Sequence, residues 1–159
     1  MAVTILGIDP GLRITGYAVI SSNGGKPKVR EAGVVKTRND DKFEERLKTI
    51  YDGLEAVISE FKPDSISVEK LYSHYNHPLT AVIMGHARGM IFLCAARHNI
   101  PVESYASTRI KKSLTGSGRA SKLQMQNSVK SVLRLKEVPK SADVADAIAT
   151  ALCHWEAVR

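Results

Sequence analysis

The sequence predicts an α/β domain in which helices cover a mixed sheet. Three short apolar segments with β-branched residues open the chain, and their short connections predict three antiparallel strands. Two more strand-like segments follow, with a helical stretch before each of them and only helices after the last. These observations predict five strands, the first three antiparallel. The length fits one domain that spans residues 1–159.

Each element has a local signal. Short apolar and β-branched runs predict strands at residues 3–9, 15–20, 29–37, 65–70 and 101–105. The run SNGGKP between the second and third strands predicts a turn. Apolar residues at helical spacing, interrupted by a flexible basic loop at 115–121, predict helices at 43–61, 79–97, 107–114, 122–133 and from about 142 onwards.

Charge and composition narrow the class of partner and the compartment. Lys and Arg number 23 against 16 Asp and Glu, so the net charge of +7 favours a polyanion, with nucleic acid first and an anionic membrane second. No uninterrupted apolar segment is long enough to span a bilayer, and the N-terminus lacks a signal pattern. Cys94 and Cys153 lie in apolar helical segments and are interpreted as small core residues. We therefore expect a cytoplasmic protein without a membrane partner.

Carboxylates stand where the pattern predicts apolar surroundings. Asp9 closes the first strand and Glu69 closes the fourth, and a buried carboxylate needs a cation, N–H donors or an open cleft. Asp143 and Asp146 are neighbours on the last helix, on a side otherwise lined by small residues. A solvated helix face is the ordinary alternative for this pair. If the elements converge, oxygen ligands suit Mg²⁺ or Mn²⁺, and one or two such ions can hydrolyse phosphodiesters.

Three segments resemble the RuvC-type Holliday junction resolvases, which have a ribonuclease-H-like fold. They are GIDPGLRITGYAVI, SVEKLY and SADVADAIATAL, and the resemblance extends over essentially the whole chain, with the three segments in the family's order and at fitting intervals. The resemblance implies a homodimer that nicks two symmetric strands of a four-way DNA junction in recombination and repair, leaving 5′-phosphate and 3′-hydroxyl ends. It also implies a branch-migration complex of the RuvAB type as a partner.

The resemblance assigns catalytic and metal-binding roles to Asp9, Glu69, Asp143 and Asp146, with one or two Mg²⁺ ions for which Mn²⁺ substitutes. Some family members carry histidine at the position of Asp143. Tyr72 stands where the family commonly has a phenylalanine that can stack on an unpaired base, although a core aromatic is the alternative. The basic residues implied or suggested as phosphate contacts are Lys111, Lys122, Arg119, Arg109, Lys112 and Arg13.

Other functions stay open at this level. The helix at 79–97 is apolar on more sides than one sheet face requires, which fits either a buried helix or a dimer interface, and the resemblance favours the dimer. A non-catalytic junction-binding module would bind without cutting, and a ribonuclease H would use similar carboxylates on RNA–DNA hybrids. A sugar-kinase-like or actin-like phosphotransferase needs a second half-domain, for which 159 residues leave no room.

Overall fold

One mixed sheet forms the centre of the molecule. The computed structural model describes residues 2–71 and 77–159. The strand order is β3-β2-β1-β4-β5. Neighbouring strands are antiparallel from β3 to β1 and parallel from β1 to β5. The strands are β1 (Ala2–Asp9), β2 (Ile14–Asn23), β3 (Lys28–Lys36), β4 (Ser65–Glu69) and β5 (Val102–Tyr105).

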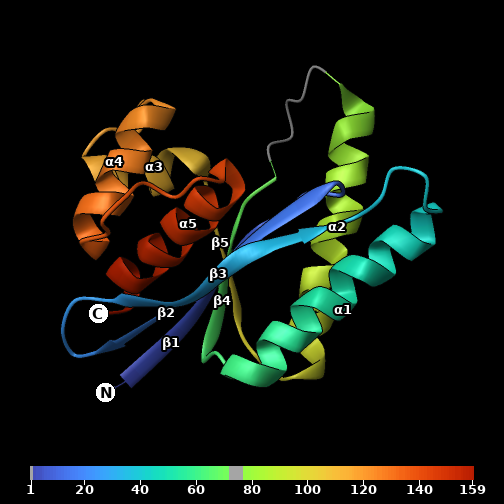
Figure 1. The fold of residues 1–159 in the computed structure, drawn as a ribbon, viewed down its shortest axis with the longest axis horizontal. Coiled ribbons are helices and arrows are strands. Elements are labelled where there is room, and N and C mark those ends of the chain that lie inside the picture. Colours follow the sequence, from blue (N-terminus) through green and yellow to red (C-terminus); the bar gives the residue numbers. More distant parts are fainter. Residues whose placement is uncertain (1, 72–76) are drawn as a thin grey trace.

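Helices cover both faces of this sheet (Figure 1). One layer consists of α1 (Phe43–Phe61) and α2 (Pro78–Arg97), and the other places α5 (Ala142–Val158) on the sheet with α3 (Ser107–Thr115) and α4 (Lys122–Leu133) beside it. Each layer encloses its own hydrophobic cluster, because β1 and β2 send alternate side chains to opposite faces. The predicted α/β fold with a five-stranded mixed sheet is therefore confirmed.

The end of strand β2 differs from the expectation. Strand β2 extends to Asn23 because residues 21–23 continue to pair with β1, so the turn begins at Gly24, whose φ of 76° suits glycine. The Ser22 hydroxyl donates to the Gly25 carbonyl oxygen at 2.6 Å and closes that turn. Polar residues that favour a turn by composition thus lie in the strand. Cys94 and Cys153 are buried and free, as expected.

The expectation that no apolar segment is long enough to span a bilayer needs a correction at helix α2. Among the described residues it is the one helix long and apolar enough, by length and composition, to cross a membrane, although only 28% of that window is buried. His86 and Arg88 interrupt its apolar run, which is why no uninterrupted segment is visible in the sequence. Its inner side, with Ala87, Ile91 and Cys94, packs into the core between the sheet and α1.

Candidate active site

The parallel pairing of β1 and β4 brings two carboxylates to one edge of the sheet. Ile8 is opposite Val68, so Asp9 and Glu69 are the next residues at the carboxyl ends of adjacent strands. Because parallel strands end at the same edge, these side chains become neighbours although 59 residues of chain lie between them. This juxtaposition depends on strand order and is not visible from local spacing.

Glycines let helix α5 approach the same edge closely. A Cβ atom at Gly7 would lie 2.2 Å from the Ala147 carbonyl oxygen, and one at Gly16 would lie 2.2 Å from that of Asp143. Since Gly16 pairs with Asp9 across β1 and β2, the first turns of α5 rest beside Asp9. The absence of side chains at these two glycines therefore brings the α5 aspartates to the end of β1.

The beginning of α5 is locally well defined. The Ser141 hydroxyl oxygen accepts a hydrogen bond from the Val144 N–H at 3.5 Å, which caps the helix. The same hydroxyl donates to Asp143 Oδ2 at 3.4 Å. Asp143 lies in the first turn, where the helix dipole favours a negative charge. Local capping therefore stabilises the acidic pair at the end of the helix that faces Asp9.

Burial and neighbouring carboxylates raise the pKa values of Asp9 and Asp146. Burial, followed by the charges of Asp146, Asp143 and Glu69, raises the pKa of Asp9 to about 7, against a lowering effect of Lys122. Burial also raises the pKa of Asp146, with Asp143 adding to it and Lys122 and Lys111 opposing it. These mutual effects show that carboxylates from β1, β4 and α5 share one electrostatic environment.

Glu69 belongs to the same environment. Burial raises its pKa, a hydrogen bond with Ser107 lowers it, and the charge of Asp146 raises it further. Lys111 and Arg88 also lower it. No ion pair within 4.0 Å recorded among the described residues includes Asp9, Glu69, Asp143 or Asp146. The negative charge of this pocket is therefore only partly balanced by the nearby protein cations.

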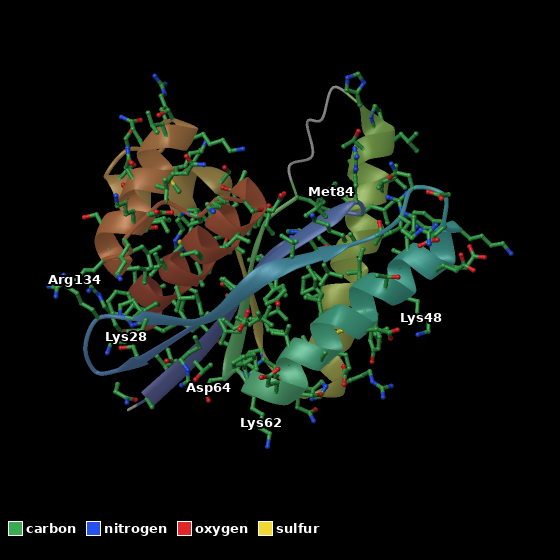
Figure 2. The ribbon with its side chains drawn as sticks, in the orientation of Figure 1. Lys28, Lys48, Lys62, Asp64, Met84 and Arg134 are labelled. Atoms are coloured by element: carbon green, nitrogen blue, oxygen red, sulfur yellow. The ribbon has the colours of Figure 1, made fainter. Side chains whose placement is uncertain are left out.

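Two cavities flank Glu69. The larger has a volume of about 300 Å³ and is lined by Glu69, Asp146, Lys111, Lys122 and, among others, Ser107 and Met125. The smaller, of about 140 Å³, lies between Asp9, Glu69 and Arg88, and Met84, labelled in Figure 2, marks its α2 side. Carboxylates and lysines thus line one cleft, in which the lysines can meet an anion beside the acidic pocket.

The donor set fits a hard divalent cation. All four side chains offer carboxylate oxygens, which Mg²⁺ and Mn²⁺ prefer, and a cation would offset the repulsion that contributes to the raised pKa values of Asp9, Glu69 and Asp146. Within residues 2–71 and 77–159, however, no three His, Cys, Asp or Glu side chains are arranged closely enough to hold an ion as they stand. Binding an ion therefore requires these carboxylates to close around it.

The expected DNA-binding residues divide into two groups. Lys111 and Lys122 line the larger cavity with the carboxylates. The others lie apart from it: the Arg109 guanidinium stacks over the Tyr105 ring at 4.7 Å, and Arg13 lines a separate cavity with Lys36. Lys112 and Arg119 are exposed on α3 and on the loop after it. Tyr72 lies outside the described residues.

Two residues near Glu69 are not among those expected from the sequence. Arg88 reaches the carboxyl end of β4 from α2, and Ser107 meets the Glu69 carboxylate from the start of α3. A positive charge in the middle of a largely apolar helix is a signal that could have singled out Arg88, because a buried cation needs a partner. Ser107 carries no comparable signal, since a serine at the start of a helix is ordinary.

The sheet order, together with acidic residues on β1, β4 and α5, places the molecule in the ribonuclease-H-like class of α/β domains. Comparison with known proteins narrows this class. The family model described as crossover junction endodeoxyribonuclease RuvC matches residues 5–154. The RuvC crossover junction endodeoxyribonuclease of Rhodopirellula baltica is 54% identical over 152 residues, which cover 96% of this chain and 85% of the relative. That of Alkaliphilus oremlandii is 46% identical and covers 94% of this chain and 91% of its own.

Solved structures agree with the sequence relatives. T. thermophilus RuvC in complex with a Holliday junction substrate superposes with a TM-score of 0.91 at 32% identity, over 96% of this chain and 93% of that one. The yeast mitochondrial resolvase Ydc2, at 18% identity and a TM-score of 0.65 over 96% of this chain and 78% of its own, shares the fold. The chain belongs to the RuvC family of crossover junction endodeoxyribonucleases. It is a Holliday junction resolvase, an endonuclease that acts on junction DNA.

Proposed function

We propose that this chain, as one nuclease domain spanning residues 1–159, nicks two symmetric strands of a four-way junction using Mg²⁺ held by Asp9, Glu69, Asp143 and Asp146. The observation that carries this proposal is the convergence of carboxylates from β1, β4 and α5 around two cavities that share Glu69, the larger of which is bordered by lysines. One or two ions per site, with Mn²⁺ as a substitute, match this number of oxygen ligands.

The chain's own residues divide the work between metal and phosphate. A bound divalent ion supplies Lewis-acid activation of water and of the scissile phosphate. Asp9, Glu69 and Asp146 orient it from three different elements, and Asp143 adds charge at the first turn of α5. Lys111 and Lys122 line the same cleft as Glu69 and Asp146, where they would hold the phosphate and offset the negative charge that develops on it. Hydrolysis then leaves a 5′-phosphate and a 3′-hydroxyl.

The outer stripe of α2 supports a homodimer. Val82, Gly89 and Leu93 follow one another along one side of this helix, and Val82 and Leu93 are 55% and 48% exposed. A Cβ atom at Gly89 would meet nothing within 4 Å, so another helix backbone can approach there. A two-fold dimer places two equivalent sites on two equivalent strands of the junction. We therefore propose that α2 pairs the two subunits.

The remaining roles follow from the family and the charge of the chain. The net charge of +7 fits a DNA surface to which Lys112, Arg119, Arg109 and Arg13 contribute phosphate contacts beyond the cleft. Tyr72, three residues after Glu69, would stack on an unpaired base at the junction centre. We further propose a cytoplasmic location and cooperation with a branch-migration complex of the RuvAB type.

A labelled synthetic four-way junction tests the proposal. We expect paired symmetric nicks with Mg²⁺ and none in excess EDTA. Asp9→Asn, Glu69→Gln and Asp146→Asn should each lower the nicking rate by more than a hundredfold, a limit set by the roughly 10–100-fold effect of losing an outer-shell residue. Junction affinity should change little, because phosphate contacts lie elsewhere. Asp52→Asn, an exposed change on α1, is the matched control.

The same substrates separate the alternatives. Tight junction binding with no nicking in Mg²⁺ or Mn²⁺ would identify a binding module instead. Faster cleavage of an RNA–DNA hybrid than of the junction would identify a ribonuclease H. A variant of Asp9, Glu69 or Asp146 that keeps near-normal turnover would remove that residue from the metal site.

A further inference from the structure

Arg88 is a buried cation that the proposed chemistry does not use. It lies in the middle of α2, only 9% exposed, on a helix otherwise rich in apolar residues. Removing an arginine from water is unfavourable unless hydrogen bonds replace those lost, and an apolar side chain of similar size would fill the space at lower cost. The contacts that this guanidinium makes therefore point to its role.

The Arg88 guanidinium bridges the carboxyl ends of two strands. One of its nitrogens, Nη1, donates to the backbone carbonyl oxygen of Glu69, and Nη2 donates to the Ser104 hydroxyl at 3.5 Å. Val68 and Ser104 are opposite one another in β4 and β5, so both contacts fall where the two strands end. The Phe92 ring, one helical turn further along α2, lies 5.5 Å from the guanidinium carbon. Arg88 is thus held between α2 and the strand ends.

The backbone at Glu69 is paired on one side only. Pairing of β4 with β1 stops at Val68, so Glu69 is beyond the ladder on that side. On the other side, the Lys70 N–H donates to the Tyr105 carbonyl oxygen at 2.8 Å. The hydrogen bond from Arg88 to the Glu69 carbonyl adds a second restraint to the peptide plane that follows Glu69, on the side where β1 no longer pairs. It therefore also restricts the direction in which the Glu69 side chain leaves the backbone.

We propose that Arg88 is a positioning residue that holds the backbone of Glu69 so that its carboxylate faces Asp9 and Asp146. It acts from behind the pocket, across the smaller cavity that Asp9, Glu69 and Arg88 line together. This inference rests on the proposed metal-binding role of Glu69. It also gives α2 two tasks, since its outer stripe is proposed to pair the subunits while its inner side holds a metal ligand in place.

Substitutions of Arg88 test the proposal when metal affinity and turnover are measured separately. Arg88→Met keeps much of the side-chain volume and removes every donor, whereas Arg88→Lys keeps one cationic donor group. Arg97→Met, which removes an exposed cation from the last turn of the same helix, is the matched control. Affinity for Mn²⁺ is followed by the rise in melting temperature during metal titration, and Mg²⁺ dependence by nicking of a labelled junction.

We expect Arg88→Met to weaken Mn²⁺ binding and to raise the Mg²⁺ concentration for half-maximal nicking by about tenfold, as for loss of an outer-shell residue. Arg88→Lys should fall between Arg88→Met and the parent chain, and Arg97→Met should match the parent. Junction affinity without divalent metal should stay within about twofold in all three. If Arg88→Met does not fold, the same intermediate shift in Arg88→Lys supports the proposal, and a parent-like metal response overturns it.

The outcomes distinguish this proposal from the function on which it depends. An Arg88→Met protein that folds and has parent-like metal affinity and Mg²⁺ dependence overturns the positioning role and leaves the nuclease proposal intact. A parent chain that nicks junctions equally well in excess EDTA, or a Glu69→Gln variant that nicks normally, overturns the function itself. A lower nicking rate at unchanged metal affinity would also reject positioning of the metal ligand, because it would indicate a general loss of active protein.

Discussion

The two helical layers contact the central sheet in different ways. On one side α5 lies against β1 and β2 through small residues, with alanines on the helix and Gly7 and Gly16 on the strands, so backbone meets backbone. On the other side large side chains such as Ile8, Ile50 and Leu54 fill the space between the sheet and the α1–α2 layer. The first layer brings carboxylates to the end of β1, and the second leaves an apolar stripe uncovered. Close packing serves the proposed active site, and looser coverage leaves a surface for a partner.

The largest expected effect comes from adding one methyl group to the closely packed layer. Gly7→Ala would place a Cβ atom 2.2 Å from the Ala147 carbonyl oxygen, which neither the strand nor the helix can avoid without moving. We expect the free energy of unfolding to fall by about 3 kcal/mol or more, and nicking to be lost as α5 moves away from Asp9. Urea denaturation and the junction assay measure these two effects.

Gly89→Ala is the corresponding change in the α1–α2 layer. Nothing lies within 4 Å of the added Cβ atom, and alanine favours a helix over glycine by roughly 0.5–1 kcal/mol. We expect the unfolding stability of the single subunit to be unchanged or slightly higher, whereas the added methyl group would weaken the proposed contact between two α2 helices. A Gly7→Ala variant as stable as Gly89→Ala would break the comparison, because it would show that close contact is not required on the α5 side.

The uncovered stripe of α2 predicts an effect on assembly. Leu93→Glu places a charge in the proposed interface of both subunits, so the dissociation constant of the dimer should rise at least tenfold, or about 1.4 kcal/mol. Junction nicking should fall in proportion to the lost dimer. Val158→Glu, an equally exposed apolar position near the end of α5, is the control. Light scattering that shows parent-like mass for Leu93→Glu would contradict the assignment of this face.

The acidic pocket predicts opposite effects of one substitution on stability and activity. The pKa of Asp9 is raised to about 7 in the folded protein, so the folded state holds more protons than the unfolded state between about pH 4 and pH 7. This group therefore lowers stability as pH rises through that range. At pH 8 without divalent metal, Asp9→Asn should be more stable than the parent by about 1 kcal/mol or more, although it should not nick junctions.

Added Mg²⁺ sharpens this contrast. It should raise the melting temperature of the parent at pH 8 by relieving the repulsion among the carboxylates, and it should raise that of Asp9→Asn much less. Equal stabilisation of both proteins by Mg²⁺ would show that the ion binds elsewhere. A parent chain that is more stable than Asp9→Asn at pH 8 without metal would contradict the raised pKa.

A smaller effect is expected near the other end of α5. His154 is buried, with one ring nitrogen 2.7 Å from the Tyr105 hydroxyl and the other 2.9 Å from that of Ser65. Burial lowers its pKa, and Glu103 opposes this weakly. The unfolded state then binds the proton more readily, so stability is lost as pH falls below the unfolded value of 6.5.

Between pH 5 and pH 7, the stability of His154→Gln should fall less than that of the parent as the pH is lowered. The difference in slope should not exceed about 1.4 kcal/mol per pH unit, the value for one proton. Melting temperatures at half-unit pH steps measure it. An unchanged profile would show that His154 does not titrate in this range. Asp9 has the opposite effect, because its raised pKa lowers stability as the pH rises. The effects of Asp9, beside α5, and of His154, within α5, on the pH dependence of stability therefore partly cancel.

Local patterns predicted the fold well because they report on burial. The order of strands and helices and most of their bounds follow from apolar periodicity. The end of β2 is the exception, because its residues are polar but their backbone still pairs with β1. The packing of α5 could not be predicted in this way. Gly7 and Gly16 look ordinary in sequence, and only the helix above them shows why a side chain is excluded.

The identities of several candidate site residues could be predicted from the sequence, but their convergence in space could not. Asp9, Glu69 and the α5 aspartates stood out because a charge ends or interrupts an apolar run, but their convergence depended on the family resemblance, since strand order is not encoded by spacing. A cation in the middle of an apolar helix could have singled out Arg88, but its partners, the Glu69 carbonyl oxygen and the Ser104 hydroxyl, depend on the sheet and are not marked by any sequence pattern. Arg109, which the sequence predicts to contact DNA, also stacks over the Tyr105 ring, a contact that no sequence pattern marks.

The packing of β1 against α5, the last helix described, has a consequence for biosynthesis. A ribosome synthesises Asp9 137 residues before Asp146, so a nascent chain that ends before α5 lacks part of the acidic set. Prematurely terminated products that lack α5 would therefore be unable to damage the chromosome, even if their sheet had begun to form.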